Sequence, residues 1–171
     1  QALEHAKAAI ADGDMGTASA LYGQILAREP GHAAAAAGLA RCYLAAGDRA
    51  KAKQILDGLP ADAKKDPEIV AARSALDLAE QGAAAGDVAK LAGQVQQNPK
   101  DHQARLDLAT ALFADGDSQA ALDQLLELYK LDRKWNDEAA RKQLLKLFEA
   151  LGPNHPVVAS GRRRLSSLLF S

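Results

Sequence analysis

A 34-residue internal period constrains this chain more than any other feature of its sequence. The stretch from Gly13 to Pro30 has the pattern of a tight turn, an amphipathic helix and a proline stop. Similar stretches begin at Gly47, which lies 34 residues later, and at Gly116. The equivalent positions are Gly13, Gly47 and Gly116; Ala18, Ala52 and Ala121; and Tyr22, Leu56 and Leu125. A period of this size predicts stacked helical units that bury their apolar faces against each other.

Each unit contains residues suited to a helix–turn–helix. Glycine can adopt the left-handed conformation that ends a helix, and the aspartate after it can cap the next helix. The recurring alanine is small enough for two helices to approach closely. The predicted pairs span about 2–30 (helices 2–11 and 15–28), 33–60 (33–46 and 49–58), 67–98 (67–84 and 88–97) and 101–131 (102–115 and 118–131), followed by terminal helices 137–151 and 156–170. The 67–98 pair is degenerate, because it departs from the 34-residue spacing. Its turn glycine, Gly86, lies 39 residues after Gly47 and 30 residues before Gly116.

This 34-residue helix–turn–helix period resembles the tetratricopeptide repeat. The usual tryptophan of that repeat is missing, and Ala2, Ala36 and Arg105 occupy its places. The resemblance implies an all-α, tetratricopeptide-like helical-repeat solenoid with two additional C-terminal helices. We expect a single domain over residues 1–171, since this length suits one domain.

The overall composition excludes several functional classes. Hydrophobic residues make up 48% of the chain but aromatic residues only 4%, which suits close-packed helices. The net charge of -1 gives no general attraction to nucleic acid or to an anionic membrane, and no apolar run reaches the length of a membrane span. The four histidines do not pair with each other or with the lone Cys42 at metal-ligand spacing. We find no catalytic motif and predict neither an enzyme nor a metal or cofactor site.

Residues from about 87 to 171 resemble, more specifically, the C-terminal region of the bacterial chaperedoxins, a family of thioredoxin-like co-chaperones. The residues that carry this resemblance are Asn98-Pro99, Leu106 to Ala109, Gly116, Ala120 to Leu122, Leu125-Leu126, Arg141-Lys142, Phe148, Leu151-Gly152 and Arg162 to Phe170. The resemblance implies a cytoplasmic holdase that binds unfolding client proteins during stress and passes them to the chaperonin. It also implies a thioredoxin domain before Gln1. Because a helical pattern begins at the first residues of the chain, we expect the chain to be a fragment that lacks this domain.

The resemblance places chaperonin docking on the last helix, at Arg162, Arg163, Arg164, Leu165, Leu168, Leu169 and Phe170. The alternative for this helix is a solenoid cap, because Leu165, Leu168 and Leu169 form one helical face. Phe170 is harder to bury, since chain ends fray. The three arginines point in different directions on a helix and lack interleaved aromatic residues, which argues against a nucleic-acid site.

The first helix of each pair is predicted to line a groove. The repeat register places Leu3, Lys7, Ile10, Ala34, Ala37, Arg41, Leu44, Gln103, Leu106, Thr110 and Phe113 there. Leu3 and Lys7 occupy two positions where repeat domains that clamp acidic chaperone tails need Lys and Asn, so such a clamp is not predicted. A mostly apolar lining suits client proteins, and it suits equally another domain packed against it.

An alternative function is a repeat scaffold that assembles a bacterial envelope or secretion complex. Cys42 is interpreted as a buried packing residue rather than a reactive thiol. Trp135, the single tryptophan, is interpreted as a packing anchor between the last regular pair and the terminal helices.

Overall fold

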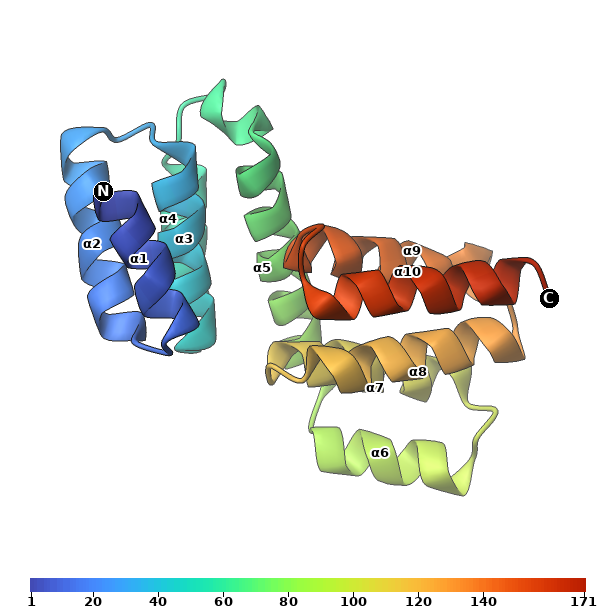
Figure 1. Cartoon of the computed structure of the whole chain (residues 1–171). Helices are drawn as coiled ribbons and strands as arrows, with labels where there is room; N and C mark the ends of the chain where they lie inside the picture. Colours follow the sequence, from blue (N-terminus) through green and yellow to red (C-terminus); the bar gives the residue numbers. More distant parts are fainter. The chain divides into compact units, whose positions relative to one another are not determined.

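The computed structural model describes all residues, 1–171, and every regular element in it is helical (Figure 1). The elements are α1 (Ala2–Ala11), α2 (Met15–Arg28), α3 (Ala33–Ala45), α4 (Arg49–Asp57), the short 3-10 helix η1 (Ala63–Lys65), α5 (Pro67–Ala85), α6 (Val88–Gln97), α7 (His102–Ala114), α8 (Ser118–Leu131), α9 (Trp135–Leu151) and α10 (Pro156–Leu169). The predicted all-α fold is therefore confirmed, and most predicted helix ends agree to within a residue.

The helices group into two compact units. Unit 1 comprises residues Gln1–Leu76 and unit 2 comprises Asp77–Ser171. The division falls inside α5, the longest helix, within the predicted degenerate pair. Ile69 and Leu76, from the first part of α5, belong to a core cluster of unit 1, whereas Gly82, from its second part, contacts α7 of unit 2.

The recurring Gly-Asp pair ends one helix and begins the next, as the sequence predicts. At the end of α3, Gly47 has a φ of +78°, and the Asp48 N–H donates to the carbonyl of Tyr43 at 2.8 Å, five residues back. This is the hydrogen bond of a Schellman motif, which glycine permits because it has no Cβ. The Asp48 side chain then accepts from the Lys51 N–H at 3.0 Å and caps α4. Gly13-Asp14 and Gly116-Asp117 repeat the arrangement.

Small residues let neighbouring helices approach closely in unit 1. Ala18 and Ala52 are both fully buried, and Tyr22 is 3% exposed. A Cβ on Gly38 of α3 would lie 2.3 Å from the ring of Tyr22 in α2, so only glycine fits beneath that ring. The sequence predicts the close approach at the recurring alanine, and the structure adds a second one at Gly38.

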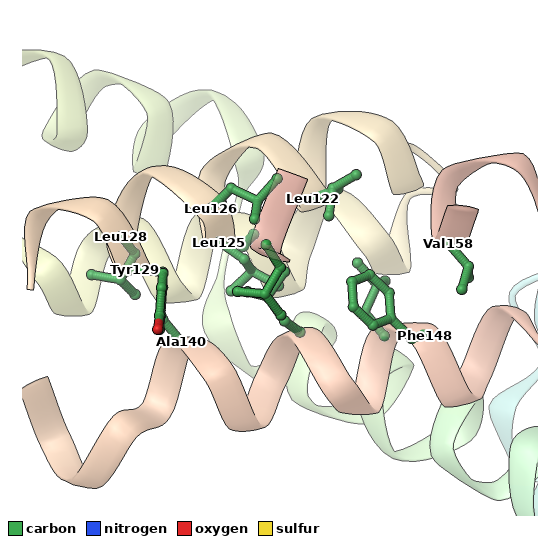
Figure 2. Close-up of a cluster of buried hydrophobic side chains, with 12 residues drawn as sticks. Leu122, Leu125, Leu126, Leu128, Tyr129, Ala140, Phe148 and Val158 are labelled. Carbon is green, nitrogen blue, oxygen red and sulfur yellow. The ribbon is translucent and has the colours of Figure 1, made fainter. Parts of the chain in front are cut away.

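The larger of the two core clusters of unit 2 lies between α8, α9 and α10. Figure 2 shows Leu122, Leu125, Leu126 and Leu128 of α8 together with Phe148 of α9 and Val158 of α10. Leu122, Leu128 and Val158 are fully buried. Burial of one such side chain contributes about 1.5–3 kcal/mol, so this cluster fixes the position of the last two helices against α8.

The regular part of α9 begins later than predicted. Asn136, Asp137 and Glu138 have positive φ values of 47°, 57° and 59°, which form a left-handed turn after Trp135. The right-handed helix therefore starts after Glu138 and not at residue 137. Each non-glycine residue in this region costs about 1–3 kcal/mol, and such a conformation persists only where surrounding contacts hold it.

Trp135 supplies one such contact. Its indole lies edge-on to the imidazole of His102 in α7, with ring centroids 5.6 Å apart and planes at 68°. It also packs against the α8–α10 core. The predicted role of Trp135 as a packing anchor is confirmed.

Candidate functional site

The inner face of α10 is fixed in the core of unit 2. Leu165 is 7% exposed and Val158 is fully buried, while Leu168 is partly buried against the same cluster. At Gly161 the helix comes so close to its neighbours that a Cβ would lie 2.6 Å from the Phe148 ring and 2.9 Å from Leu122. This face therefore behaves as the cap that the sequence offered as an alternative.

The other face of the last turn of α10 is apolar and exposed. Phe170 is 90% exposed and Leu169 is 46% exposed. The predicted docking set is thus divided, because Leu165 and Leu168 face the core while Leu169 and Phe170 face solvent. Sequence periodicity placed Leu165, Leu168 and Leu169 on a single face, and the structure separates Leu169 from the other two.

The three arginines of α10 have different surroundings. The guanidinium of Arg162 lies 6.0 Å from the ring centroid of Phe148, and Arg164 Nη1 lies 2.6 Å from Asp123 Oδ1 on α8. Arg163 is exposed and makes no ion pair. A fourth arginine, Arg133, donates from Nη2 to the carbonyl of Leu168 and so ties the end of α10 to the segment before α9. Arg163 thus differs from Arg162 and Arg164, whose guanidinium groups contact Phe148 and Asp123.

The predicted groove residues of unit 1 differ widely in exposure. Leu3, Ile10 and Leu44 are partly buried and pack against the cores of this unit. Lys7 is exposed and lies 3.4 Å from Glu4, and Arg41 is also exposed. Ala37 is 2% exposed, so its side chain contributes to the core rather than to a surface. Ala34 is partly buried.

The predicted groove residues of unit 2 lie on α7. Thr110 is 6% exposed, and its hydroxyl donates to the Leu106 carbonyl at 2.8 Å. Leu106 and Phe113 are partly buried against the core, and Gln103 is exposed. Leu106 and Thr110 also border a hollow in this unit, so part of the predicted lining does meet an open space.

That hollow has a volume of about 400 Å³ and includes residues that the sequence analysis missed. Gln81 comes from the second part of α5, Asp107 from α7 and Gln143 from α9. Gln143 Nε2 donates to Gln81 Oε1 at 3.0 Å across 62 residues of sequence. No motif spans that separation. The only available signal is that Gln81 and Asp107 lie on the predicted first helices of successive pairs and Gln143 on the first of the two predicted terminal helices.

Cys42 is buried, as the sequence predicts. Its side chain is 2% exposed, and burial raises the pKa of the thiol, an effect that a hydrogen bond with Ser19 partly opposes. A thiol with a raised pKa is a poor nucleophile at neutral pH. The predicted burial of Cys42 is confirmed, and its side chain belongs to a core cluster of unit 1.

Two other kinds of site are absent from the structure. No group of three or more His, Cys, Asp and Glu side chains is placed to hold a metal ion. None of the helices combines the length and the apolar character needed to cross a membrane.

Comparison with known proteins identifies the repeat. A family model described as tetratricopeptide repeat matches residues 80–170, more than half of the chain, and a second model of the same description matches residues 9–76. Both models describe the repeat alone and carry no information about a co-chaperone. No curated protein matches the chain.

A search of solved structures finds a domain of similar length. It is the crystal structure of a domain of protein VP0806, of unknown function, from Vibrio parahaemolyticus RIMD 2210633. The two sequences are 20% identical, the TM-score is 0.46, and the alignment covers 98% of this chain and 97% of that one.

Proposed function

The chain belongs to the tetratricopeptide repeat family, and from this premise we propose that it is the protein-binding part of a thioredoxin-like co-chaperone. Such repeats act in general as protein-interaction modules and not as catalysts. In this proposal the module holds unfolding client proteins in the cytoplasm and docks on the chaperonin through α10. The thioredoxin domain is proposed to precede Gln1 in the same protein.

The observation that carries the docking proposal is the apolar end of α10. Phe170 and Leu169 expose 90% and 46% of their surface, although the opposite face of the same helix is buried. Exposed apolar area is unfavourable in water by about 25 cal/mol per Å², and this free energy is recovered when a partner covers it. A helix with apolar anchors on one side suits an apolar groove on another protein. The charge of Arg163 is available to meet an acidic group beside such a groove.

Client holding is proposed for the first helices of the pairs. Leu106 and Thr110, both predicted groove residues, border the hollow in unit 2. Its volume of about 400 Å³ lies within the range of about 300–1,000 Å³ typical of ligand pockets. The hollow supports a binding role for α7 that is separate from the end of α10.

The docking proposal is tested by binding of the chain to a purified bacterial chaperonin, measured by co-sedimentation or biolayer interferometry. Point variants are preferable to removal of α10, because α10 supplies Val158 and Leu165 to the core. We expect the Leu169→Ala/Phe170→Ala variant to bind at least about tenfold more weakly, since each anchor is worth about 1.5–3 kcal/mol when buried. Leu145→Ala is the matched control, because Leu145 of α9 is 48% exposed.

The controls separate the possible results. Weakened binding of the double variant with normal binding of Leu145→Ala supports docking through α10. Equal binding of all three proteins shows that the chaperonin uses another surface. Failure of the unmodified chain to bind removes the chaperonin from the proposal.

A further inference from the structure

The hollow in unit 2 is held open by contacts among the three helices that border it. It lies between the second part of α5, the middle of α7, and α9. A Cβ on Gly82 would lie 2.5 Å from the Thr110 carbonyl oxygen, so α5 and α7 touch there with almost no gap. Asp77 and Lys146 link α5 to α9 by an ion pair of 3.3 Å. These fixed walls mean that the hollow exists before any ligand enters, which lowers the entropic cost of binding.

One part of the lining is apolar and another carries a negative charge. Ala84, Ala85 and Leu106 provide the apolar surface. Asp107 is the single charged side chain among the lining residues, and its Oδ1 accepts from Gln103 Nε2 at 2.9 Å. Asp107 takes part in none of the ion pairs of unit 2, in which Lys146 pairs with Asp77, Lys142 with Asp137 and Arg164 with Asp123. The hollow therefore favours a ligand with an aliphatic portion and a positive end.

The two glutamines supply the groups that a peptide bond requires. The hydrogen bond from Gln143 Nε2 to Gln81 Oε1 leaves the amide N–H groups of Gln81 and the amide oxygen of Gln143 without a partner in that pair. A backbone carbonyl can accept from Gln81, and a backbone N–H can donate to Gln143. The pair is thus suited to one peptide group of an extended chain.

We propose that this hollow binds an extended segment of a client polypeptide that carries a lysine or arginine. The methylene groups of that side chain pack on Leu106, Ala84 and Ala85, and its cation pairs with Asp107. The backbone beside it bonds to Gln81 and Gln143. The inference rests on the proposed holding of client proteins and gives it a chemical preference, where the sequence predicted only an apolar groove.

The test uses fluorescently labelled, end-capped peptides and the full chain, with binding measured by fluorescence anisotropy. The peptides share one uncharged sequence and differ at the central residue, which is lysine, glutamine or glutamate. We expect the lysine peptide to bind about tenfold more tightly than the glutamine peptide, because its hydrogen bond to the carboxylate is charge-assisted. The glutamate peptide should bind most weakly, since Asp107 repels it.

Three variants test which residues of the hollow bind the peptide. Asp107→Asn should remove the preference for lysine, whereas Asp115→Asn, an equal charge change outside the hollow, should preserve it. Gln81→Ala should weaken all three peptides by a similar factor and leave the order unchanged. Helical content and melting temperature of each variant, measured by circular dichroism, check that the fold is intact.

Several results would overturn the inference. They are equal binding of the three peptides, an unchanged lysine preference in Asp107→Asn, or binding of butylammonium as tight as that of the lysine peptide, which would identify a site for a free cation. The chaperonin assay is independent of these results. Normal chaperonin binding without a lysine preference refutes this inference alone, and loss of both refutes the proposed function as well.

Discussion

Replacement of Gly161 by alanine tests whether α10 packs against α8 and α9 as closely as the structure indicates. Alanine in the interior of a helix is normally better than glycine by about 0.5–1 kcal/mol. At Gly161 the new methyl group would lie 2.6 Å from the ring of Phe148 and 2.9 Å from Leu122. Phe148 is 4% exposed and Leu122 is fully buried, so neither can move aside into solvent.

Overpacking of this kind costs about 1–3 kcal/mol, which exceeds the gain in helix propensity. We therefore expect Gly161→Ala to lower the free energy of unfolding of unit 2. Gly93 provides the matched control, because it lies inside α6 of the same unit and a Cβ there would have no atom within 4 Å. Gly93→Ala should raise the free energy of unfolding by about 0.5–1 kcal/mol.

The assay is urea and thermal unfolding of the full chain, followed by the fluorescence of Trp135. This is the only tryptophan, and it packs against the core that contains Leu122 and Phe148, so its signal reports on unit 2. For a unit of this size, 1 kcal/mol corresponds to a shift of about 4–8 °C in the midpoint. A midpoint for Gly161→Ala that rises as much as that of Gly93→Ala would refute the close packing of α10.

Three further predictions concern single side chains. Leu144→Ala removes a fully buried side chain from the same core and should cost about 2–5 kcal/mol in urea unfolding followed by tryptophan fluorescence; a cost below about 1 kcal/mol would contradict its placement. Asp123→Ala breaks the ion pair with Arg164, but both side chains are about half exposed, so the free energy of unfolding measured in urea should fall by less than about 1 kcal/mol, and a larger loss would show that the pair anchors α10. Hydrogen bonds from the Thr17 hydroxyl and backbone N–H lower the pKa of Asp14, and hydrogen bonds from the Lys51 backbone N–H and side chain lower the pKa of Asp48, each below the usual 3.8. Because the folded pKa is the lower one, the stabilisation from both carboxylates is fully present only well above the unfolded value of 3.8 and is lost as the pH falls through the folded pKa; NMR titration should give midpoints below 3.8 for both, and midpoints at or above that value would contradict the capping role.

The sequence determined the repeat and the ends of its helices because both depend on local interactions. Gly47 and Asp48 specify a helix end and a helix start through bonds that reach no more than five residues along the chain. The recurring Ala18 and Ala52 mark the close helix contacts of each pair, and both are fully buried. Such signals are read directly from spacing, which is why most predicted helix ends agree with the structure.

The strained backbone before the regular part of α9 could not be predicted from the sequence. The left-handed turn at Asn136, Asp137 and Glu138 contains no glycine, the residue whose presence would have predicted positive φ values. It is a conformation that local preferences oppose, and tertiary contacts such as that between Trp135 and His102 accompany it. A prediction from residue preferences alone therefore extends the regular helix into this turn.

Tertiary structure alone decided which candidate residues are available to a partner. Leu165 and Phe170 belong to the same predicted docking helix, yet one is 7% and the other 90% exposed. Periodicity gives the relative direction of side chains around a helix, but the neighbouring helices determine which direction is buried. For the same reason Gln81, Asp107 and Gln143 meet around one hollow although they lie on three helices. Their proximity results from the packing of α5, α7 and α9, an arrangement that local sequence patterns do not encode.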